Sequence, residues 1–257
     1  TWTLIDNAGN SITDTQTITI TDNEPPSLLV SADIVDNADS NSCNAQVSVI
    51  SPVVTDNCEV ATVVNDYNGT NDASDIYPVG TTTITWIVTD TYGNTTSGIQ
   101  NITILDVEDP IVSFCPSDIV VCEDQNQVSW PTPVFSDNCS LGTVSSSHNP
   151  GDTFSLGNTE VTYTALDLYG NSVTCSFNIL VHQQPYFSVI TNDASCFEYN
   201  DGTAQLNIVG GVAPYTEDWG GEDPDSLEEG SYMVSLIDSN GCVEIENFSI
   251  SQPSDIV

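Results

Sequence analysis

Residues 83–94 read TITWIVTDTYGN, and their pattern predicts the class of the fold. Large side chains recur at alternate positions among β-branched residues, and an Asp-x-x-Gly-Asn turn follows from Asp90 to Asn94. Alternation of this kind indicates a half-buried strand, and aspartate and glycine favour a tight turn into a partner strand. We therefore predict a β-hairpin in which Trp86 and Val88 share the buried face and residues 99–105 form the second strand.

The same turn recurs along the chain. Its aspartates stand at positions 6, 90, 167 and 238, and a glycine follows three residues later each time. Repeats about 70 to 85 residues apart are too long for helical solenoids and are typical of small all-β modules in series. Strands at residues 2–5 and 161–166, with partners at 15–21 and 173–181, complete two further hairpins. No segment shows a helical apolar period with caps, so we expect almost no helix.

The composition excludes several classes of partner. The chain has 37 acidic residues, no lysine and no arginine, which gives a formal net charge of −37. Nucleic acids and anionic membranes are poor partners for such a surface. No apolar run is long enough to span a membrane, so we expect no direct membrane insertion and expect any export signal to lie outside this sequence. Without basic side chains, the carboxylates depend on water, hydrogen bonds or bound cations.

The repeat pattern predicts how the chain is divided into modules. Residues 47–58 align without a gap on residues 128–139, so two homologous modules are present. Proline marks each junction and predicts a semi-rigid, elongated rod. The predicted segments are 1–21, the closing strands of a preceding repeat; 22–106 and 107–182, the two homologous modules; 183–253, a different module; and 254–257, the start of a following segment.

Residues 107–182 closely resemble the hyalin repeat, an immunoglobulin-like extracellular module linked to adhesion. The motifs that carry this resemblance are Asp109-Pro110, Cys115-Pro116, Trp130-Pro131, Asp137-Asn138-Cys139 and Gly170-Asn171. Residues 22–106 resemble it less fully, because they lack the Cys-Pro pair and the cysteine of the closing strand. The resemblance implies tandem immunoglobulin-like β-sandwich modules.

Residues 183–253 look like the SprB-type repeat. The matching residues include Cys196, Gly210-Gly211, Trp219, Gly230 and Asp238 to Cys242. That repeat occurs in very large surface adhesins of gliding bacteria of the Bacteroidetes type. The resemblance implies a cell-surface, extracellular protein exported by type IX secretion, with a role in gliding motility or attachment.

Eight cysteines indicate disulfides formed in an oxidising compartment. The first module has Cys43 and Cys58, and the second has Cys122 and Cys139 at corresponding places, together with Cys115 and Cys175. Because the extra two are absent together from the first module, we predict that each module closes its own pairs. The predicted disulfides are Cys43–Cys58, Cys115–Cys175, Cys122–Cys139 and Cys196–Cys242.

Calcium is the sharpest chemical hypothesis. Asp22 and Glu24 stand at one junction, and Asp106, Glu108 and Asp109 stand at the next, so hard oxygen ligands gather where two modules meet. By analogy with cadherin-type linkers, a calcium ion at either place would fix the angle between modules. The alternative is that these residues are solvated acidic linkers, because their spacing matches no EF-hand loop.

We predict that the chain is not an enzyme. His148 and His182 accompany no nucleophile elbow and no metalloprotease helix, and we expect both at the surface. The predicted function is that of a structural repeat segment of a secreted bacterial filament or adhesin. Its predicted partners are neighbouring repeats, other filament subunits or surface polysaccharide. The alternatives are a carbohydrate- or ligand-binding module and an animal hyalin-like matrix protein.

Overall fold

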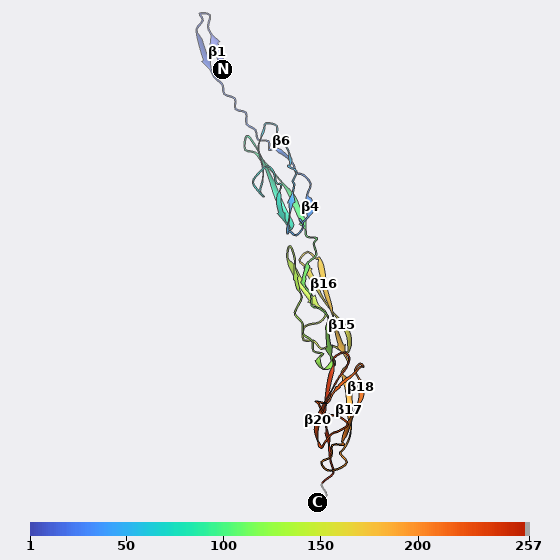
Figure 1. The fold of residues 1–257 in the computed structure, drawn as a ribbon. Coiled ribbons are helices and arrows are strands. Elements are labelled where there is room, and N and C mark those ends of the chain that lie inside the picture. The colour runs from blue at the N-terminus through green and yellow to red at the C-terminus, as the bar shows by residue number, and fades with distance from the viewer. Residues whose placement is uncertain (255–257) are drawn as a thin grey trace. The chain divides into compact units, whose positions relative to one another are not determined.

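The computed structural model describes residues 1–254, and their regular elements are strands apart from one 3-10 helix, η1 (Glu123–Gln125). The chain divides into two compact units, Thr1–Glu108 and Asp109–Val257 (Figure 1). No helix in the described part of the chain is long and apolar enough to cross a membrane. The prediction of an all-β chain is confirmed. Of the predicted following segment, residues 254–257, all but Ser254 lies outside the described residues.

A short hairpin opens the first unit. Strand β1 (Trp2–Ile5) pairs antiparallel with β2 (Ser11–Asp14), and Leu4 lies opposite Ile12. The prediction that residues 15–21 form the second strand is wrong. Because the turn from Asp6 ends at Asn10, pairing starts at once at Ser11, and it stops after four residues with the end of β1.

The rest of the first unit is a module of several small sheets. The main sheet has the order β4-β10-β9-β7, in which β4 runs parallel to β10 and the other neighbours are antiparallel. The smaller sheets are β3-β6 and β5-β8. The strands are β3 (Ser27–Leu29), β4 (Ile34–Asn37), β5 (Asn44–Val47), β6 (Val53–Thr55), β7 (Val60–Asn65), β8 (Asp75–Pro78), β9 (Gly80–Asp90) and β10 (Thr95–Leu105).

The core of this module lies under the hairpin that the sequence predicted. Trp86 and Val88 of β9 are fully buried, as the alternation requires. The indole Nε1 of Trp86 donates a hydrogen bond to Oε1 of the buried Gln100 on β10, at 3.2 Å. Tyr77 of β8 is fully buried in the same apolar cluster. The core therefore joins the main sheet to the β5-β8 pair.

The second unit begins with a module of the same strand order. Its main sheet is β12-β16-β15-β14, with β12 parallel to β16, and β11 pairs with β13 beside it. The buried cluster includes Trp130, Tyr163 and Phe177. The strands are β11 (Ile111–Phe114), β12 (Ile119–Cys122), β13 (Val134–Ser136), β14 (Leu141–Ser146), β15 (Gly157–Asp167) and β16 (Ser172–His182).

A different module completes the second unit. Strands β17 and β18 pair with each other, and β19, β20 and β21 form a separate sheet. Phe187 of β17 is buried with Val234 and Leu236 of β20. The strands are β17 (Pro185–Asn192), β18 (Thr203–Gly210), β19 (Thr216–Asp218), β20 (Gly230–Ile237) and β21 (Val243–Ile250).

The disulfides differ from the predicted scheme. Cys115 is bonded to Cys175, which is a pairing that the sequence predicted. Cys122 is bonded to Cys242 in the following module, which makes both Cys122–Cys139 and Cys196–Cys242 wrong. Cys58 and Cys196 are free thiols, so Cys43–Cys58 is wrong as well.

Strand direction explains these errors. Cys122 ends β12, which runs parallel to β16, and it lies opposite His182, the last residue of β16. Cys139 instead follows β13, whose Ser136 lies opposite Ile111 at the start of the module. The two cysteines therefore lie at opposite ends of the module. Cys122 lies at the end where the chain leaves for the next module, which carries Cys242.

Candidate functional site

The carboxylates that the sequence predicted at the junctions have different surroundings in the structure. Glu24 is exposed. The Glu108 carboxylate accepts hydrogen bonds from the Ser40 hydroxyl and the Asn41 backbone N–H, and Asp109 accepts one from the backbone N–H of Ser172. Asp22 of the predicted set joins a compact acidic cluster within the first unit.

That cluster consists of Asp22, Asp56 and Asp90. Asp22 precedes β3, Asp56 follows β6, and Asp90 ends β9. One carboxylate oxygen of each lies within 4.8 Å of the others. Asp90 is 2% exposed, and the other two are half-buried. The fold thus brings together three negative charges that are far apart in the sequence.

The sequence predicted that Asp90 is a turn residue, and the structure confirms this role as well. Its Oδ1 accepts hydrogen bonds from the backbone N–H groups of Tyr92 and Asn94, and its Oδ2 accepts one from the Asn94 side chain. Burial raises the pKa of the Asp90 carboxyl, but these bonds and one from Gly93 lower it more, so the net pKa lies below its ordinary value. Asp90 is therefore ionised at neutral pH.

Asp56 was missed by the sequence reasoning, although a signal for it was present. Asp22, Asp56 and Asp90 recur one repeat later in the sequence as Asp106, Asp137 and Asp167. A repeated aspartate can cap a local turn, so the repetition alone did not separate a ligand from a turn residue. The sequence does not show that Asp22, Asp56 and Asp90 meet, and the folded structure does.

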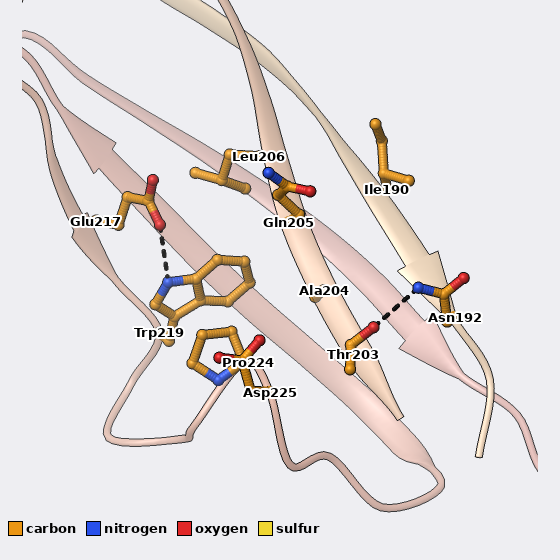
Figure 2. A pocket seen from close by; sticks show the side chains of 10 residues that line it. All are labelled: Ile190, Asn192, Thr203, Ala204, Gln205, Leu206, Glu217, Trp219, Pro224 and Asp225. Atoms are coloured by element: carbon orange, nitrogen blue, oxygen red, sulfur yellow. Dashed lines mark hydrogen bonds between the residues drawn. The ribbon is translucent and has the colours of Figure 1, made fainter. Parts of the chain in front are cut away.

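A polar hollow lies in the last module, beside Trp219 (Figure 2). It has a volume of about 480 Å³. The indole Nε1 of Trp219 donates a hydrogen bond to Glu217 Oε2 at 3.1 Å, and the ring packs edge-on against Phe248. The lining residues are Ile190, Asn192, Thr203, Ala204, Gln205, Leu206, Glu217, Trp219, Pro224 and Asp225.

The two histidines form no catalytic constellation in the described residues. The His148 ring packs on Phe154, and its Nδ1 lies 3.1 Å from the Ser147 hydroxyl. His182 is the last residue of β16. The described residues offer packing surfaces, an acidic cluster that could hold a cation and a polar hollow beside Trp219.

These features define a tandem β-sandwich repeat protein, and the comparisons with known proteins give the family. The HYR domain family matches residues 21–104 and again residues 105–181, and the SprB repeat family matches residues 188–220. The chain belongs to the HYR domain family, and a SprB repeat follows its two HYR domains. Both resemblances expected from the sequence are confirmed, and both are to repeat modules rather than to enzymes.

Among curated proteins, similar chains come from animals. The Sushi, von Willebrand factor type A, EGF and pentraxin domain-containing protein 1 of Rattus norvegicus is 33% identical over 193 residues, which are 73% of this chain and 5% of that protein. Hyalin of Lytechinus variegatus is 32% identical over 195 residues, which are 72% of this chain and 36% of that protein. The chain thus spans well under two thirds of the length of either relative.

Similar solved structures are strings of β-modules. The I-band fragment I67–I69 from titin matches with a TM-score of 0.44 and 10% identity, covering 90% of this chain and 99% of that one. Drosophila N-cadherin EC1-3 matches with a TM-score of 0.39 and 15% identity, covering 88% and 99%. At TM-scores this low, nothing about this protein is inferred from either likeness.

Proposed function

We propose that the chain is a structural repeat segment of a secreted bacterial cell-surface filament or adhesin, which supports attachment or gliding motility. The observation that carries the proposal is the series itself: two HYR domains are followed by a SprB repeat, and the last two modules are joined by the Cys122–Cys242 disulfide. A covalent link between neighbours suits a segment that transmits force along the chain.

Burial of the aromatic residues supports a structural role. Trp86 is 0% exposed, and Trp130 and Tyr163 are each 6% exposed. Side chains buried this deeply stabilise the core of their own module and are not available to a ligand. The partners proposed for this segment are its neighbouring repeats, other filament subunits and surface polysaccharide. The proposed export route, type IX secretion, rests on the SprB resemblance.

A deletion tests this function. Residues 22–254 would be removed in frame in the organism that makes the protein, with export of the remainder followed by surface labelling. We expect attachment or gliding to fall while the shortened protein still reaches the surface. Unchanged attachment and gliding in cells that display the shortened protein would contradict the proposal.

One observation favours a second function, carbohydrate binding at the Trp219 hollow. A half-buried indole beside amide, hydroxyl and carboxylate groups could receive a sugar ring and its hydroxyls. The volume lies in the range of small-molecule sites.

A glycan array tests the second function without disturbing the indole. Gln205 and Asp225 line the hollow and are exposed, so Gln205→Ala and Asp225→Ala remove polar groups while Trp219 keeps its packing. Binding that weakens by about tenfold in both variants would support the site, since each lost hydrogen bond to a ligand costs about 1 kcal/mol or more. A wild-type chain that binds no glycan on the array would contradict it.

A further inference from the structure

The acidic cluster of the first HYR module has carboxylate oxygens that accept no hydrogen bond. Oδ1 of Asp22 accepts a hydrogen bond from the Glu24 backbone N–H, and Oδ1 of Asp56 accepts two, from the N–H groups of Cys58 and Glu59. The other oxygen of each, Oδ2, is buried and accepts no hydrogen bond. Each carboxylate is thus held by one oxygen, and no N–H or O–H group donates to the other.

A buried charged oxygen without a partner is costly unless a cation or donor meets it. This chain has no lysine or arginine to supply one. The free Cys58 thiol lies next to Asp22, but a thiol is only a weak donor, so it does not neutralise the carboxylates.

We propose that Asp22, Asp56 and Asp90 of the first HYR module bind a calcium ion. Three convergent carboxylates are hard oxygen ligands, and calcium accepts six to eight such ligands in flexible geometry, with water and backbone carbonyls completing the set. Magnesium demands a tighter octahedron and keeps its water, and zinc prefers nitrogen and sulfur ligands. The donor set therefore favours calcium.

The position of the site gives the ion a structural task. Its ligands come from the segment before β3, the turn after β6 and the turn between β9 and β10. Asn94 of that last turn already contacts the first segment, because its side-chain N–H donates to the backbone carbonyl of Asp22 at 3.3 Å. A calcium ion would fasten the segment that enters the module to two of the module's own turns.

The second HYR sequence repeats the local pattern. Oδ1 of Asp137 accepts hydrogen bonds from the backbone N–H groups of Cys139 and Ser140, and its Oδ2 is buried without one, as in Asp56. Oδ1 of Asp106 accepts the backbone N–H of Glu108, as Asp22 accepts that of Glu24. The arrangement is thus a property of the HYR sequence and not of a single turn.

The test compares two aspartates of the same module. Asp56→Asn removes one ligand charge, yet its amide oxygen can still accept the bonds from Cys58 and Glu59. Asp72→Asn is the matched control, because Asp72 is exposed, caps the Ser74 N–H in a similar local turn and lies outside the cluster. Calcium chloride would be titrated calorimetrically into the full chain at neutral pH and physiological ionic strength.

We expect Asp56→Asn to weaken calcium binding at this site by about tenfold or more, since ligand charge tunes the affinity of such sites. We expect Asp72→Asn to stay within about twofold of wild type, because an exposed charge is screened. Equal losses in both variants would show diffuse counterion binding and overturn the proposal. So would a wild-type chain that binds no more calcium than Asp56→Asn.

Hydrogen exchange provides a second test, in which the faster-exchanging protein in chelator should become the slower one in calcium. In chelator, Asp56→Asn relieves repulsion among the three carboxylates, so we expect its exchange in residues 22–106 to be slower than that of wild type. In calcium, wild type should become the slower of the two. The same order in both conditions would contradict the site. If Asp56→Asn does not fold, Asp22→Asn decides by the same two measurements, because its amide oxygen can still accept the Glu24 N–H.

Discussion

The two HYR modules stabilise the corresponding position of their last strand in different ways. In the second module Cys175 on β16 is bonded to Cys115. By position after the Asp turn, Gly98 on β10 of the first module corresponds to Cys175, and a side chain added at Gly98 would lie 2.5 Å from a methyl carbon of Val30. The first module therefore uses close packing of Val30 over a glycine where the second uses a covalent bond.

The cores differ in a second, compensating way. Trp86 and Val49 of the first module correspond in sequence to Tyr163 and Trp130 of the second, so the large indole changes position. In the first module the Trp86 indole donates to Gln100, and in the second the Trp130 indole donates to the Tyr163 hydroxyl at 2.9 Å. What stays constant is strand order and the aspartate turns. The core side chains can be exchanged as long as the volume is filled and each buried N–H has an acceptor.

The largest expected effect is loss of the indole from the first module. Trp86→Ala should destabilise that module by about 3 to 5 kcal/mol, because it leaves a cavity and removes the donor to Gln100 Oε1. Hydrogen exchange resolved by peptide would show faster exchange in residues 22–106 and little change in residues 107–182. Uniform acceleration over both modules would mean that they do not hold their cores independently.

The disulfide gives the next largest effect, in the other module. Replacing Cys115 and Cys175 together by serine should cost the second module about 2 to 4 kcal/mol, because the bond closes a long loop. Hydrogen exchange should report the loss in residues 107–182 only. If those residues keep their wild-type protection, the packing of the second module suffices without the bond, and the contrast with the first module is wrong.

Gly98 gives a smaller effect in the first module. Gly98→Ala should cost about 1 to 3 kcal/mol, because the added methyl overpacks the contact with Val30. Adding Val30→Ala should restore part of the loss, as measured by urea denaturation followed through tryptophan fluorescence. A double variant as unstable as the sum of the single changes would argue against direct contact between the two positions.

The smallest expected effect is a loss of stability at acidic pH, and we expect it in both modules. Burial raises the pKa of the Asp167 carboxyl, but hydrogen bonds from Asn171, Tyr169 and Gly170 lower it more, and the net pKa lies below its ordinary value. A lowered folded-state pKa contributes stability above the unfolded value, and that contribution is lost as the pH falls through the folded one. Asp167→Asn should thus be less stable than wild type at neutral pH.

The measurement is the difference in urea midpoint between wild type and Asp167→Asn as a function of pH. It should shrink below about pH 4, where an ordinary aspartate becomes protonated. Asp90→Asn should behave in the same direction, since the pKa of Asp90 is also lowered by its turn. A difference that is independent of pH would show that the turn carboxylates do not stabilise through their charge.

The periodic features of the sequence predicted much of the fold. Alternation placed Trp86 and Val88 on the buried face, and the recurring turn located the hairpins. Alternation gave a wrong prediction at residues 15–21, where an alternating run looked like a strand. Pairing across a turn is decided by where the partner strand begins, and here it begins at Ser11. Alternation reports which residues suit a strand, and it does not report which residues lie opposite each other.

The site was less predictable because it depends on which ends of strands meet. The sequence placed calcium ligands at neighbouring positions such as Asp22 and Glu24, whereas the fold joins Asp22 to Asp56 and Asp90. The disulfides failed for a related reason. Cys122 lies on a strand parallel to the last one, so it points to the next module rather than to Cys139. Parallel pairing over such sequence distances leaves no local signal.

The proposed function makes this segment part of a filament or adhesin outside the cell. Antibodies raised against residues 107–182 would be applied to intact cells of the producing organism and located by immunogold electron microscopy. The account predicts label along fibres or on the outer surface of unpermeabilised cells. Label that appears only after permeabilisation, on the inside of the cell, would contradict it.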